Sequence, residues 1–266
     1  EAVTKDVDEI LMALQEQGEF KFNLPSLQSA TNGIGRGNFM VIIARPETGK
    51  TAFWVSLVAS VGGFAWQQKK VSIFANEEPA IRTQMRLLNA CTGLQRGSIL
   101  NGSRDLTKKV WGDINPYVEN FDCVGKTMDD LNEYCTNNEV DILIIDQLDK
   151  INVTGKFNAT HEKLREVYTQ ARELAKRHNI LVIGMSQASA EAQGRSRVTF
   201  STMENSKTGK AAEADLILGL GKEDEEEDFM DDCIRFVTLS KNKLTGDHKE
   251  FEVILRPTIS RFAERN

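Results

Sequence analysis

The chain has 266 residues, of which 40% are hydrophobic and 27% charged, a composition that suits one large globular domain with a substantial core. Its formal net charge of −6 argues against a protein that coats nucleic acid over its whole surface, although a local basic loop is compatible with it. No apolar run approaches the roughly 20 residues of a membrane helix, and the N-terminus lacks a basic segment followed by an apolar one, so we expect a cytoplasmic protein without a membrane partner.

The first segment has the pattern of an amphipathic helix. Apolar residues recur there at helical spacing with charges between them, at Val3, Val7, Ile10, Leu11 and Leu14. Two roles are open for such a helix: it covers the chain's own core, or it docks on a neighbouring subunit. We predict that residues 1–18 form this linker-like helix and that residues 19–266 form the main domain.

Short, continuously apolar runs recur along the rest of the chain, most of them separated by helical stretches. They cover residues 40–44, 71–75, 142–145, 180–185, 216–220, 236–239 and 251–255. Because both faces of such strands are apolar, the pattern predicts an α/β fold with a mostly parallel sheet and helices on both faces. The last two runs flank residues 245–247 closely, which predicts an antiparallel hairpin at one end.

A phosphate-binding loop follows the first of these runs. Backbone N–H groups at a helix start, the ammonium of Lys50 and the hydroxyl of Thr51 are the parts needed to hold nucleotide phosphates and Mg²⁺. Ala44 replaces the first glycine of the usual pattern, so the prediction depends on the apolar strand before the loop and the unbroken helix after it. The expected nucleotide contacts are Ala44, Arg45, Pro46, Glu47, Thr48, Gly49, Lys50, Thr51 and Ala52.

Two carboxylates follow the run at 71–75, just before a helix that is expected to start at Pro79. Either Glu77 or Glu78 could orient the water that attacks a γ-phosphate. The pair could equally be a charge cluster at a helix N-terminus.

Polar residues also end the next two apolar runs. Asp146 follows 142–145 in the pattern of a Walker B strand, whose carboxylate reaches the Mg²⁺ coordination shell. Ser186 and Gln187 follow 180–185, and the amide of Gln187 could contact the γ-phosphate and report its presence to the loop beyond. Ligands in open α/β sheets bind beyond the carboxyl ends of the strands, so these side chains are expected to share one site.

The loop after Gln187 is polar and basic, with Arg195, Arg197, Lys207 and Lys210 among small residues. This composition suits sequence-independent contact with the phosphates of a single strand, or an ordinary mobile loop. Residues 208–211 look like a second phosphate loop, but no strand precedes them and no Ser or Thr follows the lysine, so we discount them. The acidic segment 223–232 is expected to be a solvated loop.

The string at 44–51, Ala-Arg-Pro-Glu-Thr-Gly-Lys-Thr, resembles the phosphate loop of DnaB-type replicative helicases, which also lacks the first glycine. In the family segment that 74–79 resembles, the position two before Pro79 is the catalytic base, which selects Glu77. Asp146 matches the family's Walker B aspartate, and Ser186-Gln187 matches its sensor motif. Residues 205–215 resemble its DNA-loop motif. With the basic residues before it, this motif implies DNA contacts by Arg195, Arg197, Asn205, Ser206, Lys207, Gly209 and Lys210.

Residues 239–247 resemble the family's Lys-x-Arg segment, whose two cations reach across a subunit interface to the neighbour's γ-phosphate. The corresponding residues here are Lys241 and Lys243, and lysine at the second position keeps the charge but loses the bidentate fork of arginine. The resemblance spans roughly residues 24–262 and is nearest to phage replicative helicases and primase-helicases. It implies catalytic roles for Lys50, Glu77, Gln187, Lys241 and Lys243.

What the resemblance implies as a whole is a RecA-like P-loop NTPase core in residues 19–266 that uses ATP or another NTP with Mg²⁺. It further implies a homo-oligomeric ring, expected to be hexameric, which translocates on single-stranded DNA and unwinds duplex. Primase and other replisome proteins are among the expected partners. A competing class that shares the core is the RecA- or RadA-type recombination ATPases. A more distant class is an ATP-binding scaffold whose assembly is regulated by nucleotide.

Overall fold

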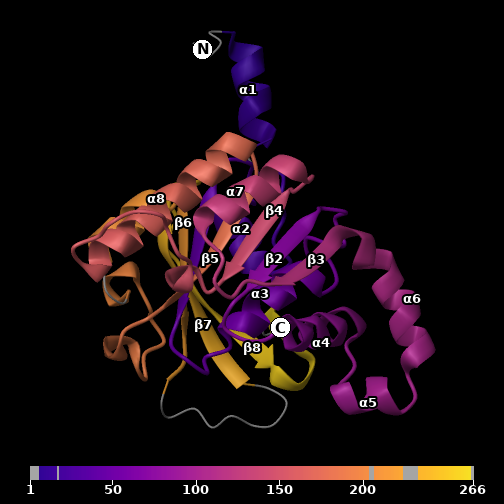
Figure 1. The fold of residues 1–266 in the computed structure, drawn as a ribbon. Helices are drawn as coiled ribbons and strands as arrows, with labels where there is room; N and C mark the ends of the chain where they lie inside the picture. The colour runs from indigo at the N-terminus through magenta and orange to yellow at the C-terminus, as the bar shows by residue number, and fades with distance from the viewer. Residues whose placement is uncertain (1–5, 17, 204–206, 224–232, 265–266) are drawn as a thin grey trace.

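A nine-stranded sheet crosses the part of the chain that the computed structural model describes, residues 6–16, 18–203, 207–223 and 233–264 (Figure 1). Its strand order is β3-β2-β4-β5-β1-β6-β7-β8-β9. The strands are β1 (Phe39–Ala44), β2 (Val71–Ala75), β3 (Val118–Asp122), β4 (Ile142–Asp146), β5 (Leu181–Gln187), β6 (Leu216–Gly221), β7 (Cys233–Asn242), β8 (Glu250–Arg256) and β9 (Arg261–Glu264).

Strands β1 to β6 pair in parallel, whereas β7, β8 and β9 extend the sheet in antiparallel pairs. The predicted mostly parallel sheet and the antiparallel hairpin, formed by β7 and β8, are therefore confirmed. Two edge strands were not predicted. In β3 only Val118 is buried, and β9 has a single buried residue, Phe262, so neither contains the continuous apolar run that marks the other strands.

Helices cover both faces of the sheet. The helices in the described ranges are α1 (Val7–Glu16), α2 (Pro25–Thr31), α3 (Lys50–Ala59), α4 (Ala80–Thr92), α5 (Arg96–Asn101), α6 (Arg104–Ile114), α7 (Met128–Asn137), α8 (Thr160–His178) and α9 (Lys207–Glu213). Alternate residues of β1 point to opposite faces: Met40 and Ile42 belong to a core with α2, α3 and α4, and Val41 and Ile43 to a core with α7, α8 and α9. Each face of the central strand thus packs against helices.

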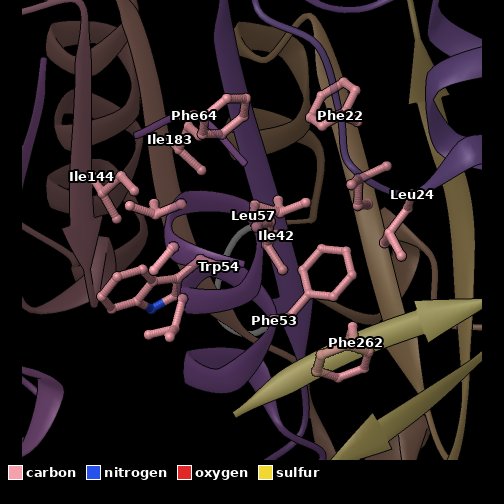
Figure 2. Packing of buried hydrophobic residues seen from close by; sticks show 14 of the residues in the cluster. Phe22, Leu24, Ile42, Phe53, Trp54, Leu57, Phe64, Ile144, Ile183 and Phe262 are labelled. Carbon is pink, nitrogen blue, oxygen red and sulfur yellow. The ribbon is translucent and has the colours of Figure 1, made fainter. Parts of the chain in front are cut away.

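Helix α3 lies in the first of these cores and follows the phosphate loop directly. Figure 2 shows its side chains Phe53, Trp54 and Leu57 among residues of the sheet such as Ile42 and Ile144. The ring of Phe53 meets that of Phe262 from β9 edge to face, with centroids 5.1 Å apart. Nearly every residue of α3 is buried, so packing fixes the start of the helix rigidly under the loop.

The predicted N-terminal helix is present as α1, which extends away from the body of the molecule (Figure 1). Its apolar side chains Val7, Leu11 and Met12 are 66%, 51% and 59% exposed. Of the two roles open to it, α1 does not cover the core of its own chain in this structure. None of the helices in the described ranges combines the length and the apolar character that crossing a membrane requires.

Candidate nucleotide-binding site

The phosphate loop connects β1 to α3 at the carboxyl end of the central strand. Ala44 is the last residue of β1 and pairs with Gln187 of β5 on one side and Leu220 of β6 on the other. Extended backbone at this position accepts any residue, which explains why alanine can stand where the usual pattern has glycine. Gly49 precedes the first turn of α3 with φ of +106°. This left-handed φ strains any residue that has a Cβ atom, so glycine is favoured there, and a Cβ atom would also approach Leu255 Cδ2 to 2.8 Å.

A cleft of about 410 Å³ opens above this loop. Three groups of residues that the sequence predicted separately meet in it: the phosphate loop, Glu77 and Gln187. Five lining residues were not predicted, namely Arg86, Cys233, Arg235, Leu255 and Pro257. The cleft therefore combines a strongly cationic wall with apolar positions from the antiparallel end of the sheet.

The two neighbouring carboxylates have different partners. Glu77 lies in the cleft, where a carboxylate oxygen is 2.9 Å from the ammonium of Lys50, a residue only 9% exposed. Glu78 instead pairs with Arg86, at 2.8 Å between Oε1 and Nε. Only Glu77 therefore shares the space above the phosphate loop.

Asp146 lies at the end of β4, beneath the start of α3. Its Oδ2 atom accepts hydrogen bonds from Trp54 Nε1 at 2.8 Å and from Thr51 Oγ1 at 3.3 Å. Burial raises the pKa of this carboxyl, against the lowering effect of the Lys50 charge. Its Oδ1 atom is buried yet accepts no hydrogen bond from any described residue. A buried carboxylate oxygen left without a donor, next to a threonine hydroxyl, fits a hard cation such as Mg²⁺.

A pair of hydrogen bonds joins the residues that follow β2 and β4. The Asn76 side chain donates to the carbonyl of Gln147 at 3.0 Å and accepts from the Gln147 N–H at 2.5 Å. The Asn76 N–H also donates to the carbonyl of Asp146. Because Asn76 directly precedes Glu77, these bonds hold Glu77 beside Asp146. A lone asparagine at a strand end gave no sequence signal for this role.

A buried arginine of β7 supports the phosphate loop. Arg235 of β7 is 2% exposed, and its Nε atom donates to the carbonyl of Thr48 at 2.8 Å. A charged residue among the apolar residues that begin this strand was the available sequence signal. Its partner lies almost 190 residues earlier in the chain, which local patterns do not reveal.

Gln187, the predicted sensor residue, ends β5 and lines the cleft. Its side-chain oxygen accepts from Gln147 Nε2 at 3.3 Å. Its backbone N–H donates to Asp149 Oδ2 at 3.2 Å, and the hydroxyl of Ser186 donates to the same oxygen at 2.9 Å. Asp149 belongs to η2 (Leu148–Lys150), a short 3₁₀ helix that follows β4. This carboxylate therefore fixes the backbone of the predicted sensor motif.

The basic loop after Gln187 is closely packed on β6. The backbone of Ser189 pairs with Thr202, and Val198 is 1% exposed. A Cβ atom on Gly219 or on Gly221 would lie 1.8 Å from a carbonyl oxygen of the loop, so both glycines are needed for its close approach. Arg195 and Arg197 remain exposed, as a role in DNA contact requires.

Helix α9 departs from the prediction for this region. Lys210 is 1% exposed, and its ammonium is 2.8 Å from Asp149 Oδ1 in the interior. In this structure a DNA phosphate cannot reach it, so the expectation of a surface contact at Lys210 is wrong. Lys207 begins α9 and Gly209 lies within it, half-buried. Asn205, Ser206 and the acidic residues 224–232 lie outside the described residues.

The two lysines expected to act across an interface lie at the end of β7. Lys241 donates to the carbonyls of Ala211 at 2.5 Å and Ala212 at 3.1 Å, the last turn of α9. Burial, with Lys243 nearby, lowers the pKa of Lys241 to about 8. The side chain of Lys243 is half-exposed, with its Nζ 3.8 Å from Asp215. The described residues that line the cleft of this chain include neither lysine.

A phosphate loop at the carboxyl end of a mostly parallel sheet, with an acidic residue on a nearby strand, defines an α/β domain of the P-loop nucleotide-binding class. Residues 20–264 match the family described as DnaB-like helicase C terminal domain, and the chain belongs to that family.

Among relatives, a probable plasmid replicative DNA helicase of Chlamydia psittaci is 31% identical over 207 residues, which are 72% of this chain and 44% of the relative. The replicative DNA helicase DnaB of Geobacillus stearothermophilus is 25% identical over 182 residues, 64% of this chain and 39% of that protein. The chain thus spans less than half the length of these two relatives.

Two solved structures share the fold. One, described as an ATPase domain, superposes with a TM-score of 0.77 and 20% identity, over 99% of this chain and 100% of that one. The other, a DnaB-like replicative helicase described with its interactions with primase, superposes with a TM-score of 0.78 and 20% identity, over 99% of this chain and 68% of that one. The predicted fold class is therefore confirmed.

Proposed function

We propose that this chain is the motor domain of a replicative DNA helicase, which hydrolyses ATP to move along single-stranded DNA. The observation that carries the proposal is the convergence of Lys50, Glu77 and Gln187 on one cleft, with Thr51 and Asp146 beneath it. Family membership and the names of the relatives support the same function.

In this proposal Lys50 and the N–H groups at the start of α3 bind the β- and γ-phosphates of ATP. Thr51 and Asp146 would hold Mg²⁺, which neutralises phosphate charge when bound. The phosphates draw Lys50 away from its ion pair, and this frees the Glu77 carboxylate to orient and polarise the attacking water. The Gln187 amide contacts the γ-phosphate.

The catalytic site is completed by a second subunit. Lys241 and Lys243 lie at the end of β7, outside the residues that line their own cleft in the described structure. We infer that they stabilise transition-state charge on the nucleotide of the next subunit in a homo-oligomeric ring, expected to be hexameric. The exposed apolar side chains of α1 suit docking on such a neighbour.

Single-stranded DNA is the proposed second ligand. The exposed Arg195 and Arg197 sit on the packed loop directly after the sensor, where a change at the γ-phosphate can alter their grip on DNA phosphates. Lys207 begins the helix that follows this loop. One structural neighbour is described with its interactions with primase, and primase is a candidate partner here for that reason.

The decisive experiment measures phosphate release with and without single-stranded DNA, together with particle mass with and without ATP. We expect hydrolysis that DNA accelerates, and a mass that corresponds to a ring. A forked duplex distinguishes the function from that of a recombination ATPase, because the latter would form filaments and pair strands without separating the fork. A particle that remains monomeric with ATP and DNA and releases no phosphate would overturn the proposal.

A further inference from the structure

The carboxylate of Asp149 is the meeting point of four donors from three parts of the fold. Its Oδ1 atom accepts from the Tyr168 hydroxyl at 2.9 Å and from Lys210 Nζ at 2.8 Å. Its Oδ2 atom accepts from the Ser186 hydroxyl at 2.9 Å and from the Gln187 N–H at 3.2 Å. Tyr168, Ser186 and Lys210 are each at most 1% exposed. One enclosed group therefore joins β5, α8 and α9.

We propose that the Asp149–Lys210 ion pair is the joint through which the nucleotide sensor moves the DNA-binding segment. Both are positioning residues: Asp149 acts through Gln187, and Lys210 acts through α9 and the loop that precedes it. The inference rests on the proposed function, and it specifies how nucleotide state is transmitted within that function.

The geometry supports transmission of the nucleotide state because the two oxygens of the Asp149 carboxylate bond different partners. One oxygen fixes the backbone of Gln187, whose side chain lines the nucleotide cleft, and the other fixes α9. A shift of Gln187 towards the γ-phosphate therefore pulls on Asp149, and Asp149 pulls on Lys210. Buried charges that lose their partner are left poorly solvated, so the pair is expected to move as a unit.

The chemical identity of Asp149 and Lys210 indicates that they fix α9 in one position against the sheet. A well-packed apolar pair can hold a helix against a sheet at least as firmly as a buried ion pair does. A lysine with its ammonium 5.3 Å from the centre of the Tyr168 ring and bound to one carboxylate oxygen instead defines a single register for α9. A coupling element needs that uniqueness more than it needs added stability.

The last turn of α9, which directly follows Lys210, is also anchored. Lys241 of β7 donates to the carbonyls of Ala211 and Ala212 in its last turn. The same helix therefore contacts the strand that bears the cations proposed to act on the neighbour's nucleotide. Through Asp149 at its middle and Lys241 at its last turn, α9 connects the proposed sensor of its own site to the residues proposed to serve the next one.

The test compares Lys210→Met, Asp149→Asn and the double variant with wild type, by ATP hydrolysis with and without single-stranded DNA and by the DNA dissociation constant. Lys150→Met is the matched control, because it removes an exposed lysine next to Asp149 in the chain. We expect each single variant to lose roughly tenfold in DNA stimulation, with the DNA dissociation constant and the basal rate changed by less than about twofold. The double variant should be no worse than the singles, because both act on one link.

Lys210→Arg retains the charge and should recover most of the DNA stimulation. If Lys210 only stabilised the fold, its loss would change the basal and stimulated rates together, and restoring the charge would not act on their ratio alone. If Lys210→Met fails to fold, the double variant carries the test, because it removes both charges and leaves no unpaired ion in the interior.

Three results would overturn the inference. The first is full stimulation in folded single or double variants, and the second is a parallel loss of the basal and stimulated rates. The third is a weakened DNA dissociation constant that accounts for the whole effect, because Lys210 would then contact DNA. In each case a stimulated wild type leaves the proposed function intact, whereas a wild type that DNA does not stimulate removes the proposed function and this inference together.

Discussion

Two buried lysines, Lys50 in the phosphate loop and Lys210 in α9, show how similar sequence signals come to mean different things. Both follow a Thr-Gly pair, and both ammonium groups pair with a carboxylate at 2.8–2.9 Å. The partner of Lys50, Glu77, lines an open cleft, so phosphates can take its place. The partner of Lys210 is enclosed by three further protein donors. Whether an ion pair lies beside open space or is enclosed by protein, more than its charges, distinguishes a candidate ligand site from a contact that only connects parts of the fold.

The largest effect is expected at Lys50. Lys50→Ala should reduce phosphate release by at least about 10²-fold, because it removes a preorganised cation from the site of developing charge. Steady-state ATP hydrolysis measures it. Lys70→Ala is the control, because Lys70 forms a surface ion pair with Glu139 and should leave turnover unchanged. Undiminished hydrolysis in Lys50→Ala would show that Lys50 does not act on the nucleotide, and the two buried lysines would then no longer differ in role.

The next effect tests the two adjacent carboxylates. Glu77→Gln should lower hydrolysis by about 10²–10⁴-fold while nucleotide binding is retained, since the variant keeps the shape of the base but cannot polarise water. Glu78→Gln is matched in chemistry and should only loosen the contact with Arg86. Single-turnover hydrolysis and binding of a fluorescent ATP analogue separate the two steps. The same loss from Glu78→Gln alone would move the base by one residue.

A smaller effect is expected at the exposed arginines of the loop. Arg195→Ala with Arg197→Ala should weaken binding to single-stranded DNA and lower the slope of log Kd against log salt by about 1.4, as two phosphate contacts require. Lys210→Met should leave that slope unchanged, which sharpens the contrast between surface and interior cations. Arg96→Ala with Arg104→Ala removes two exposed arginines elsewhere and serves as the control. An unchanged slope in the loop variant would exclude these arginines as contacts.

The smallest effect concerns the packing of the loop on β6. Gly221→Ala places a Cβ atom 1.8 Å from the Ser196 carbonyl oxygen and should cost about 1–3 kcal/mol of stability, measured by thermal unfolding. Gly112→Ala in α6 meets no atom within 4 Å and should instead stabilise by about 0.5–1 kcal/mol. If both substitutions shift the melting temperature alike, the loop is not held against β6 as described.

The comparison of the two lysines also shows which parts of the fold and of the candidate site the sequence can predict. The apolar run of β1, the phosphate loop and α3 are contiguous, so their pattern alone predicts the strand, the turn and the cation. Asp146 was predicted because its carboxylate ends an apolar strand, the same local signal. The brace from Arg235 to Thr48 and the bonds between Asn76 and Gln147 join distant segments, and residue patterns do not encode such pairings.

The same reason explains the wrong assignment of Lys210. A basic residue in a polar segment is usually solvated, and nothing nearby in the sequence indicates Asp149, which lies 61 residues earlier. The family resemblance extends along the whole loop motif, but it does not distinguish a lysine that faces outward from one that packs inward. Only the arrangement of η2 against β5 and α9 makes that distinction.

The indole of Trp54 has a practical consequence, because its N–H is bonded to Asp146 Oδ2, beside the orphaned oxygen that fits a cation. A ring so placed reports on its electrostatic surroundings through its fluorescence. Trp66 and Trp111 give a background that single Phe substitutions can subtract. In the proposed function this indole is an intrinsic optical probe beside the bound Mg²⁺ and nucleotide, and its fluorescence is expected to follow their binding without any attached label.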